Sequence, residues 1–173
     1  MYPQPYIDYL VHFHGDRDYF ECHEILEEYW KETERKKIWV GLIQLAVSLY
    51  HQRRNNYGGA YRMLKSAISI LEQELEDVSR LGLNHHSLFL ILKERLSLIE
   101  KNQAYKSLYL PIEDETLLTL CMNRSSEKNI IWWSNSDLTN TMLVNNRHTL
   151  RDRSDVIAER QLNLLKKQNN RLC

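Results

Sequence analysis

The segment from Ile38 to Arg53 constrains the fold most, because as a helix it would be apolar on nearly every side. A helix of this kind is usually buried at the centre of its domain and covered by other helices. Its apolar run, Ile38 to Tyr50, is shorter than the roughly 20 residues that a membrane span needs. We therefore predict a central core helix and no association with a membrane.

Three further segments carry apolar residues at helical spacing, and we predict helices over about 16–33, 60–78 and 86–103. The chain has only 5 Gly and 3 Pro, which favours long helices over many short strands. Asn55 to Gly59 carries the strongest turn signal. The patterns predict an all-α fold, a compact antiparallel array of about four main helices over residues 5–103.

Composition shifts after Leu110 and Pro111, where we place a boundary between a helical core domain (1–110) and a C-terminal extension (111–173). We expect the extension to pack on the core or on a partner. Within it we predict a helical turn over 117–122 and a terminal helix over 152–167. Between them we predict two short extended pieces, over 129–133 and 142–144, which are either separate or paired.

Charge and cysteine content exclude several classes of protein. Lys and Arg together number 23, as do Asp and Glu, so no global field attracts nucleic acid or a membrane surface. The three cysteines lie far apart and form no paired motif, which disfavours a disulfide framework and a cysteine-based zinc site. Reduced thiols indicate a cytoplasmic location.

Polar residues gather on two of the predicted helices. His23 and Glu27 share one face of the helix over 16–33, with Glu24 beside them, because residues four apart lie on the same side. The predicted helix over 38–53 carries a stripe of small and polar residues along one side, and Gly41 is its first member. Burying an unpartnered polar group costs about 1–3 kcal/mol, so we expect the two polar faces to meet. The predicted polar site consists of His23, Glu27, Gln44, Ser48 and His51.

Two functions follow from this polar site. In the first, the side chains form a buried hydrogen-bond network that fixes two helices in register, and the protein is a non-enzymatic interaction or scaffold module. In the second, the protein is a metal-dependent hydrolase, since two imidazoles and a carboxylate suit zinc or iron. The metal ligands would then be His23, Glu27 and His51, with Glu24 as the general base on a bound water. His23-Glu24-Ile25-Leu26-Glu27 is similar to H-E-x-x-H, with Glu replacing the second His.

The same residues resemble a family known as domain of unknown function 309. The resemblance rests on F-x-C-H-E-I-L-E-x-x-W (Phe20 to Trp30), G-L-I-Q-L-A (Gly41 to Ala46), His51, Asn56 and Gly59-Ala60, and covers about residues 8–80. It implies an all-helical fold and a polar site at His23, Glu24, Glu27, Gln44 and His51. Some members are labelled as metal-dependent hydrolases by inference. Cys22 stands where many members have Ala.

We expect a protein partner or self-association through the C-terminal extension, because the apolar residues of its last helix need cover. These residues are Val156, Ile157, Leu164 and Leu165. Nucleic-acid binding would require Arg151, Arg153 and Arg160 on one exposed face without acidic partners. The basic excess of this tail is modest, which disfavours that function. His12 and His14 are expected to face solvent.

Overall fold

The computed structural model describes residues 1–140 together with residues 158, 161, 162 and 165. Residues 1–140 contain helices α1 (Gln4–His14), α2 (Tyr19–Glu32), α3 (Lys37–Arg53), α4 (Tyr57–Gln73), α5 (Leu75–Arg80), α6 (His85–Glu100) and α7 (Glu115–Glu127). They confirm the predicted all-α fold. The only β-type pairing in this range is an isolated bridge between Leu83 and Ile112. None of the described helices has the length and apolar character needed to cross a bilayer.

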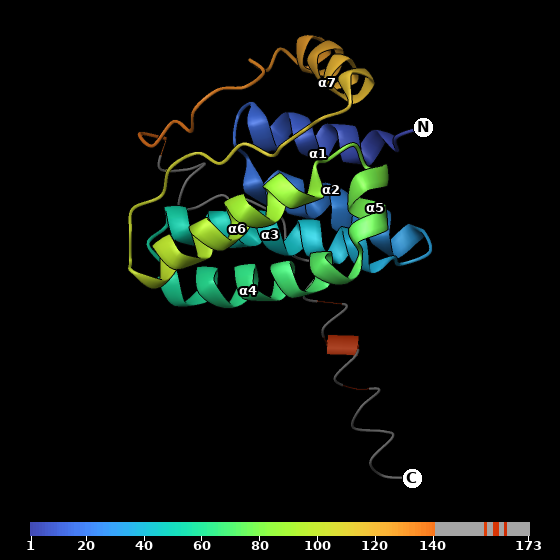
Figure 1. The fold of residues 1–173 in the computed structure, drawn as a ribbon. Coiled ribbons are helices and arrows are strands. Elements are labelled where there is room, and N and C mark those ends of the chain that lie inside the picture. The colour runs from blue at the N-terminus through green and yellow to red at the C-terminus, as the bar shows by residue number, and fades with distance from the viewer. Residues whose placement is uncertain (141–157, 159–160, 163–164, 166–173) are drawn as a thin grey trace.

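The helices pack as a sequential array. α1 packs on α2, α2 on α3, α3 on α4 and α4 on α6, while α7 packs on α1. Figure 1 shows α7 on the outer side of α1, with α4 at the opposite side of the molecule. α3 lies between α2 and α4, and its Leu42, Leu45 and Leu49 are at most 1% exposed. The predicted central helix is confirmed.

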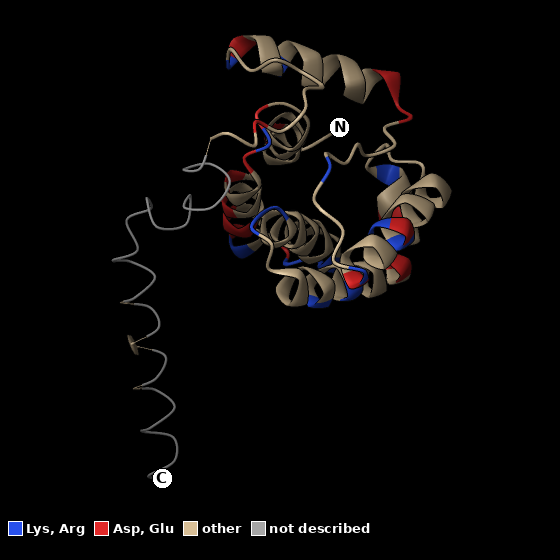
Figure 2. Ribbon diagram, turned by 90° about the vertical axis from the view of Figure 1, so that its left-hand side faces the viewer, with Lys and Arg blue, Asp and Glu red and all other residues tan. Residues whose placement is uncertain are grey.

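Acidic and basic residues are interspersed along these helices. Figure 2 shows both kinds on neighbouring turns of the ribbon. This distribution agrees with the equal numbers of the two kinds in the sequence.

Side-chain caps set the first residues of α2 and α4. The Asp18 carboxylate accepts a hydrogen bond of 3.0 Å from the Glu21 amide, so the helix predicted from about residue 16 begins at Tyr19. The Asn56 side chain accepts one of 3.1 Å from the Gly59 amide. The predicted turn over 55–59 is therefore too long, because this cap draws Gly58 and Gly59 into the first turn of α4.

The predicted helix over 60–78 is two helices. Glu74, with φ −116° and ψ 35°, leaves helical geometry and separates α4 from α5. Gly82 follows α5 with φ +76°, a conformation that favours glycine. α6 agrees with the helix predicted over 86–103, although it ends at Glu100. Asn102 then turns the chain with φ 54°.

The first part of the extension is more helical than predicted. The helical turn expected over 117–122 is the 13-residue helix α7, which begins after Asp114 because the Asp114 carboxylate accepts from the Thr116 amide. α7 is fastened to α1 by an ion pair of 2.6 Å between Arg124 Nε and Asp8 Oδ1. The division of the chain at residue 110 stays a prediction.

The expectation of an extended piece at 129–133 is wrong. Asn129 and Trp133 have φ of 55° and 64°, and the backbone there forms turns instead of a strand. The Ser125 hydroxyl donates to the Ile130 carbonyl over 2.6 Å, which folds the chain back on the end of α7. Residues 142–144, the arginines at 151, 153 and 160, and nearly all of the helix predicted over 152–167 lie outside the described residues.

Candidate functional site

One face of α2 carries a compact cluster, the α2 cluster, made of His23, Glu24 and Glu27. His23 Nδ1 lies 3.0 Å from Glu24 Oε1, and His23 Nε2 lies 2.9 Å from Glu27 Oε2. The other Glu27 oxygen lies 3.0 Å from Lys31 Nζ. The three side chains of the cluster are 24%, 20% and 34% exposed, so the cluster is open to solvent on one side.

The cluster changes the charge state of its own members. Burial alone would lower the pKa of His23, but the hydrogen bonds to Glu24 and Glu27 outweigh it and raise the pKa to about 9. The hydrogen bond from His23, helped by Lys31, lowers the pKa of Glu27 to about 2. At neutral pH and without a bound metal ion, His23 is therefore an imidazolium held between two carboxylates.

The polar stripe of α3 does not face α2 along its whole length. The Ser48 hydroxyl donates a hydrogen bond of 2.7 Å to the Ala60 carbonyl of α4. A Cβ on Gly41 would lie 2.7 Å from Leu71 Cδ2, also on α4. The expectation that Gly41 allows close approach of α2, and that Ser48 meets His23 and Glu27, is therefore wrong. Both residues lie on the α4 side of the central helix.

His51 lies near the C-terminal end of α3, beside the cap of α4. Its Nδ1 is 3.1 Å from the Asn56 side-chain nitrogen. A chain of ring contacts connects His51 to the α2 cluster. The His51 and Tyr50 ring centroids are 6.3 Å apart, and those of Tyr50 and Phe20 are 6.1 Å apart. The Phe20 ring centroid lies 5.7 Å from that of His23. His51 does not belong to the group of potential ligand atoms around His23.

Two buried polar atoms of α2 and α3 have no hydrogen-bond partner within the part of the chain that the structure describes. They are Gln44 Oε1, on α3, and Trp30 Nε1, on the same face of α2 as His23 and Glu27. Buried polar groups are almost always paired, so an unpaired donor and acceptor here are compatible with a water molecule or a bound group.

The α2 cluster fits a divalent metal ion by its donor set. One imidazole nitrogen and two carboxylate oxygens lie within 4.8 Å of one another, and this is the only such group among the described residues. Imidazole and carboxylate are ordinary ligands of zinc and iron. Glu24 takes the place that the sequence-based set gave to His51. Adjacent residues point in different directions on a helix, so the spacing predicted Glu24 to be the general base and not a ligand.

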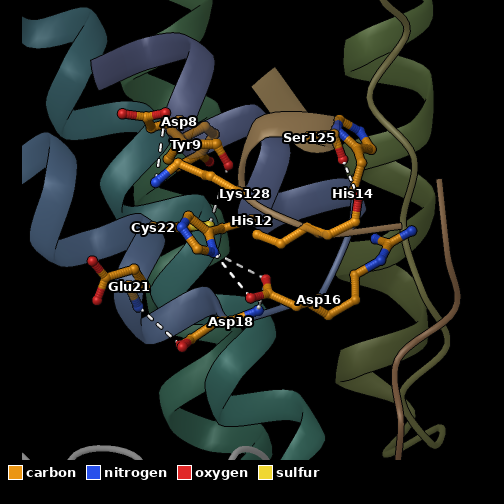
Figure 3. A network of polar contacts seen from close by, with 12 residues as sticks. Asp8, Tyr9, His12, His14, Asp16, Asp18, Glu21, Cys22, Ser125 and Lys128 are labelled. Atoms are coloured by element: carbon orange, nitrogen blue, oxygen red, sulfur yellow. Dashed lines mark hydrogen bonds and ion pairs between the residues drawn. The ribbon is translucent and has the colours of Figure 1, made fainter. Parts of the chain in front are cut away.

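A second polar network lies where α1 meets α2 and α7 (Figure 3). His12 Nδ1 is 3.0 Å from Asp16 Oδ1, and Lys128 Nζ is 4.0 Å from Asp8 Oδ1. His14 is fully buried, so the expectation that it faces solvent is wrong. The Lys128 contact joins the end of α7 to α1, and the His12 contact joins α1 to the turn that follows it.

The family model described as domain of unknown function (DUF309) matches residues 6–63, which include the whole α2 cluster and His51. The uncharacterized protein YpuF of Bacillus subtilis (strain 168) is 49% identical over 174 residues, covering 99% of each chain. No solved structure matches the chain significantly. The match to the family model and the near-complete coverage of this relative show that the chain belongs to the family of domain of unknown function 309.

Proposed function

We propose that this protein binds one divalent metal ion, zinc or iron, through His23, Glu24 and Glu27. The observation that carries the proposal is the convergence of three potential ligand atoms within 4.8 Å on a partly exposed helix face. The solvent-exposed side leaves room for a further ligand, as in metal sites that act on substrates.

A purely structural network is less well supported by the same geometry. All three residues belong to α2, so the contacts among them do not join α2 to α3. Ser48 bonds to α4, and His51 contacts the residue that caps α4. A network that fixes α2 against α3 would need partners on both helices.

The reaction class that such a site supports is metal-assisted hydrolysis. A bound zinc ion lowers the pKa of a coordinated water to about 7. Glu24, proposed as a ligand, is then not the general base that its position in the motif suggested. Two buried free thiols, Cys22 and Cys121, support a reducing, cytoplasmic location as part of the proposal.

The test is metal analysis of the purified, untagged protein, before and after reconstitution with zinc or iron(II). We expect near-stoichiometric metal in the wild type and a loss of most binding in His23→Ala, Glu24→Gln and Glu27→Gln. Glu28→Gln, an exposed change on the same helix, is the matched control and should retain the metal. His51→Ala should also retain it, which separates this site from a His23, Glu27 and His51 set. Absence of uptake by the wild type, or full uptake by Glu24→Gln, would overturn the proposal.

A second candidate function is an interaction module that self-associates through the C-terminal extension. Four apolar side chains of its described residues are more than half exposed: Ile131 80%, Leu138 58%, Leu162 52% and Leu165 57%. Sedimentation velocity over a range of concentrations should show a dimer that weakens in the double variant Ile131→Ser and Leu138→Ser. Leu90→Ser, at a 62% exposed position on α6, is the control. A monomer at all concentrations would contradict this function.

A further inference from the structure

Three arginine side chains that do not belong to the α2 cluster are buried together. Arg17 lies between α1 and α2, Arg53 is the last residue of α3, and Arg95 belongs to α6; they are 0%, 5% and 9% exposed. None of them forms an ion pair with a carboxylate in the described part of the chain. Buried charges are normally paired, because removing an ion from water is costly.

Tyrosine rings hold the three guanidinium groups in one cluster. The guanidinium carbon of Arg53 lies 4.6 Å from the Tyr19 ring centroid and 5.6 Å from that of Tyr105. Arg95 lies 5.9 Å from the same Tyr105 ring. The Nη1 atom of Arg17 lies 3.5 Å from the Tyr19 hydroxyl oxygen, and the guanidinium carbon of Arg17 lies 4.5 Å from the Tyr109 ring centroid. The rings cover guanidinium faces, so further partners must bind at the edges, where the N–H groups point.

The partners at those edges are neutral oxygen atoms. Arg17 donates from Nε to the Ser134 carbonyl over 2.8 Å and from Nη1 to the Leu108 carbonyl over 2.5 Å. Arg53 Nη1 donates to the Arg17 carbonyl over 2.8 Å and to the Ser136 hydroxyl over 2.9 Å. Arg95 Nη1 likewise donates to the Lys106 carbonyl and to Gln52 Oε1, at 2.6 and 3.0 Å. None of these described partners carries a negative charge.

Several donor nitrogens of the cluster have no hydrogen-bond partner among the described residues. Arg17 Nη2, Arg53 Nε and Arg53 Nη2 are buried and make no hydrogen bond with any residue that the structure describes. Nε and Nη2 of Arg53 form one complete edge of its guanidinium plane. Two parallel N–H groups on such an edge match two oxygens of a carboxylate or a phosphate.

We propose that Arg17, Arg53 and Arg95 form a buried binding site for one small oxyanion, inorganic phosphate, with the free edge of Arg53 as its principal contact. Phosphate is favoured over a carboxylate because it carries more than one negative charge near neutral pH, against three buried positive ones. The burial of all three side chains favours the free ion over a phosphate group on a larger molecule. Because Ser134 and Ser136 bond to the same arginines, bound phosphate would hold the segment after α7 to the core.

The test compares anions at constant ionic strength. Protein freed of phosphate by dialysis is titrated with inorganic phosphate by calorimetry, and its Tm is measured in phosphate, acetate, glycerol phosphate and chloride. We expect Tm to rise with phosphate concentration, since a ligand that binds only the folded state stabilises it. Acetate and glycerol phosphate should have little effect beyond that of chloride.

Two substitutions locate the site. Arg53→Lys keeps the charge but removes the two-nitrogen edge, and we expect at least a tenfold loss of phosphate affinity with an unchanged helical circular dichroism spectrum. Arg62→Lys, at an exposed position on α4, should bind as the wild type does. Arg17→Lys is the second variant if Arg53→Lys does not fold. Equal Tm of the wild type in phosphate and chloride would overturn the proposal, because buried water would then occupy the free edges. Equal phosphate affinity in Arg53→Lys would overturn it as well.

Discussion

His14 Nε2 accepts a hydrogen bond of 2.9 Å from the backbone N–H of Leu110, 96 residues along the chain. The other ring nitrogen, Nδ1, is 3.0 Å from the Leu10 carbonyl of the same helix and donates to it. The imidazole is therefore neutral, with its proton on Nδ1. Burial, aided by the charge of Arg17, lowers the pKa of His14 to about 3. This side chain ties the end of α1 to the segment that leads into α7.

The first prediction concerns acid stability. Unfolded His14 titrates near 6.5 and folded His14 near 3, so the unfolded chain binds more protons between these values. The free energy of unfolding should fall as pH falls from 6.5 through 3, by up to about 1.4 kcal/mol per pH unit from this residue. Urea unfolding at several pH values from 7 to 4 measures the slope. His14→Gln should be less stable at pH 7 but show a shallower slope; equal slopes would contradict the prediction.

The second prediction concerns metal uptake at the α2 cluster. The pKa of His23 is raised to about 9, so below that pH an imidazolium must lose its proton before it can bind a metal ion. Zinc affinity should therefore rise about tenfold per pH unit between pH 6 and 8. Competition with a chelator of known affinity measures it. An affinity that is constant over this range would show that His23 is not a ligand.

The third prediction tests which helix faces Gly41. Gly41→Ala places a Cβ 2.7 Å from Leu71 Cδ2, and overpacking of this kind costs about 1–3 kcal/mol. Adding Leu71→Ala should recover part of that loss, and a double-mutant cycle gives the coupling energy. Gly58→Ala is the control, since its nearest neighbour is Arg62 Nη1 at 3.5 Å and the change should be neutral or stabilising. If the effects of Gly41→Ala and Leu71→Ala on the free energy of unfolding are additive, Gly41 does not face Leu71.

The fourth prediction concerns the cap of α4. Asn56→Ala removes the acceptor for the Gly59 amide and should cost about 1 kcal/mol in unfolding free energy. Asn56→Asp keeps that acceptor but removes the side-chain nitrogen that lies 3.1 Å from His51 Nδ1. Its stability should lie closer to that of the wild type. If both variants lose the same amount, the contact with His51 and not the cap is the stabilising feature.

The parts of the structure that the sequence predicted are those fixed locally. Asp18 caps α2 within one turn, and the pairing of His23 with Glu27 follows from their four-residue spacing on a helix. The orientation of α3 could not be predicted in the same way. A helix that is apolar on nearly every side gives no periodic signal for which neighbour each face meets, and Ser48 proved to face Ala60.

The buried cations were missed for a different reason. Arg17 stands between two aspartates in a short connection, a pattern that normally belongs to solvent-exposed loops. Its partners, Leu108 and Ser134, lie 91 and 117 residues away. His14 depends in the same way on Leu110. Contacts between residues so far apart in the chain cannot be predicted from the spacing of neighbouring residue types.

The long-range hydrogen bonds of Arg17 also affect the order in which parts of the chain can fold during synthesis. Its guanidinium can leave water only when Leu108 and Ser134 are in place, because those residues supply its carbonyl acceptors. A nascent chain that ends at α6 still has Arg17 in contact with solvent. Arg17, which lies within the residues matched by the family model, 6–63, therefore reaches its native surroundings only when a segment outside that match has emerged from the ribosome.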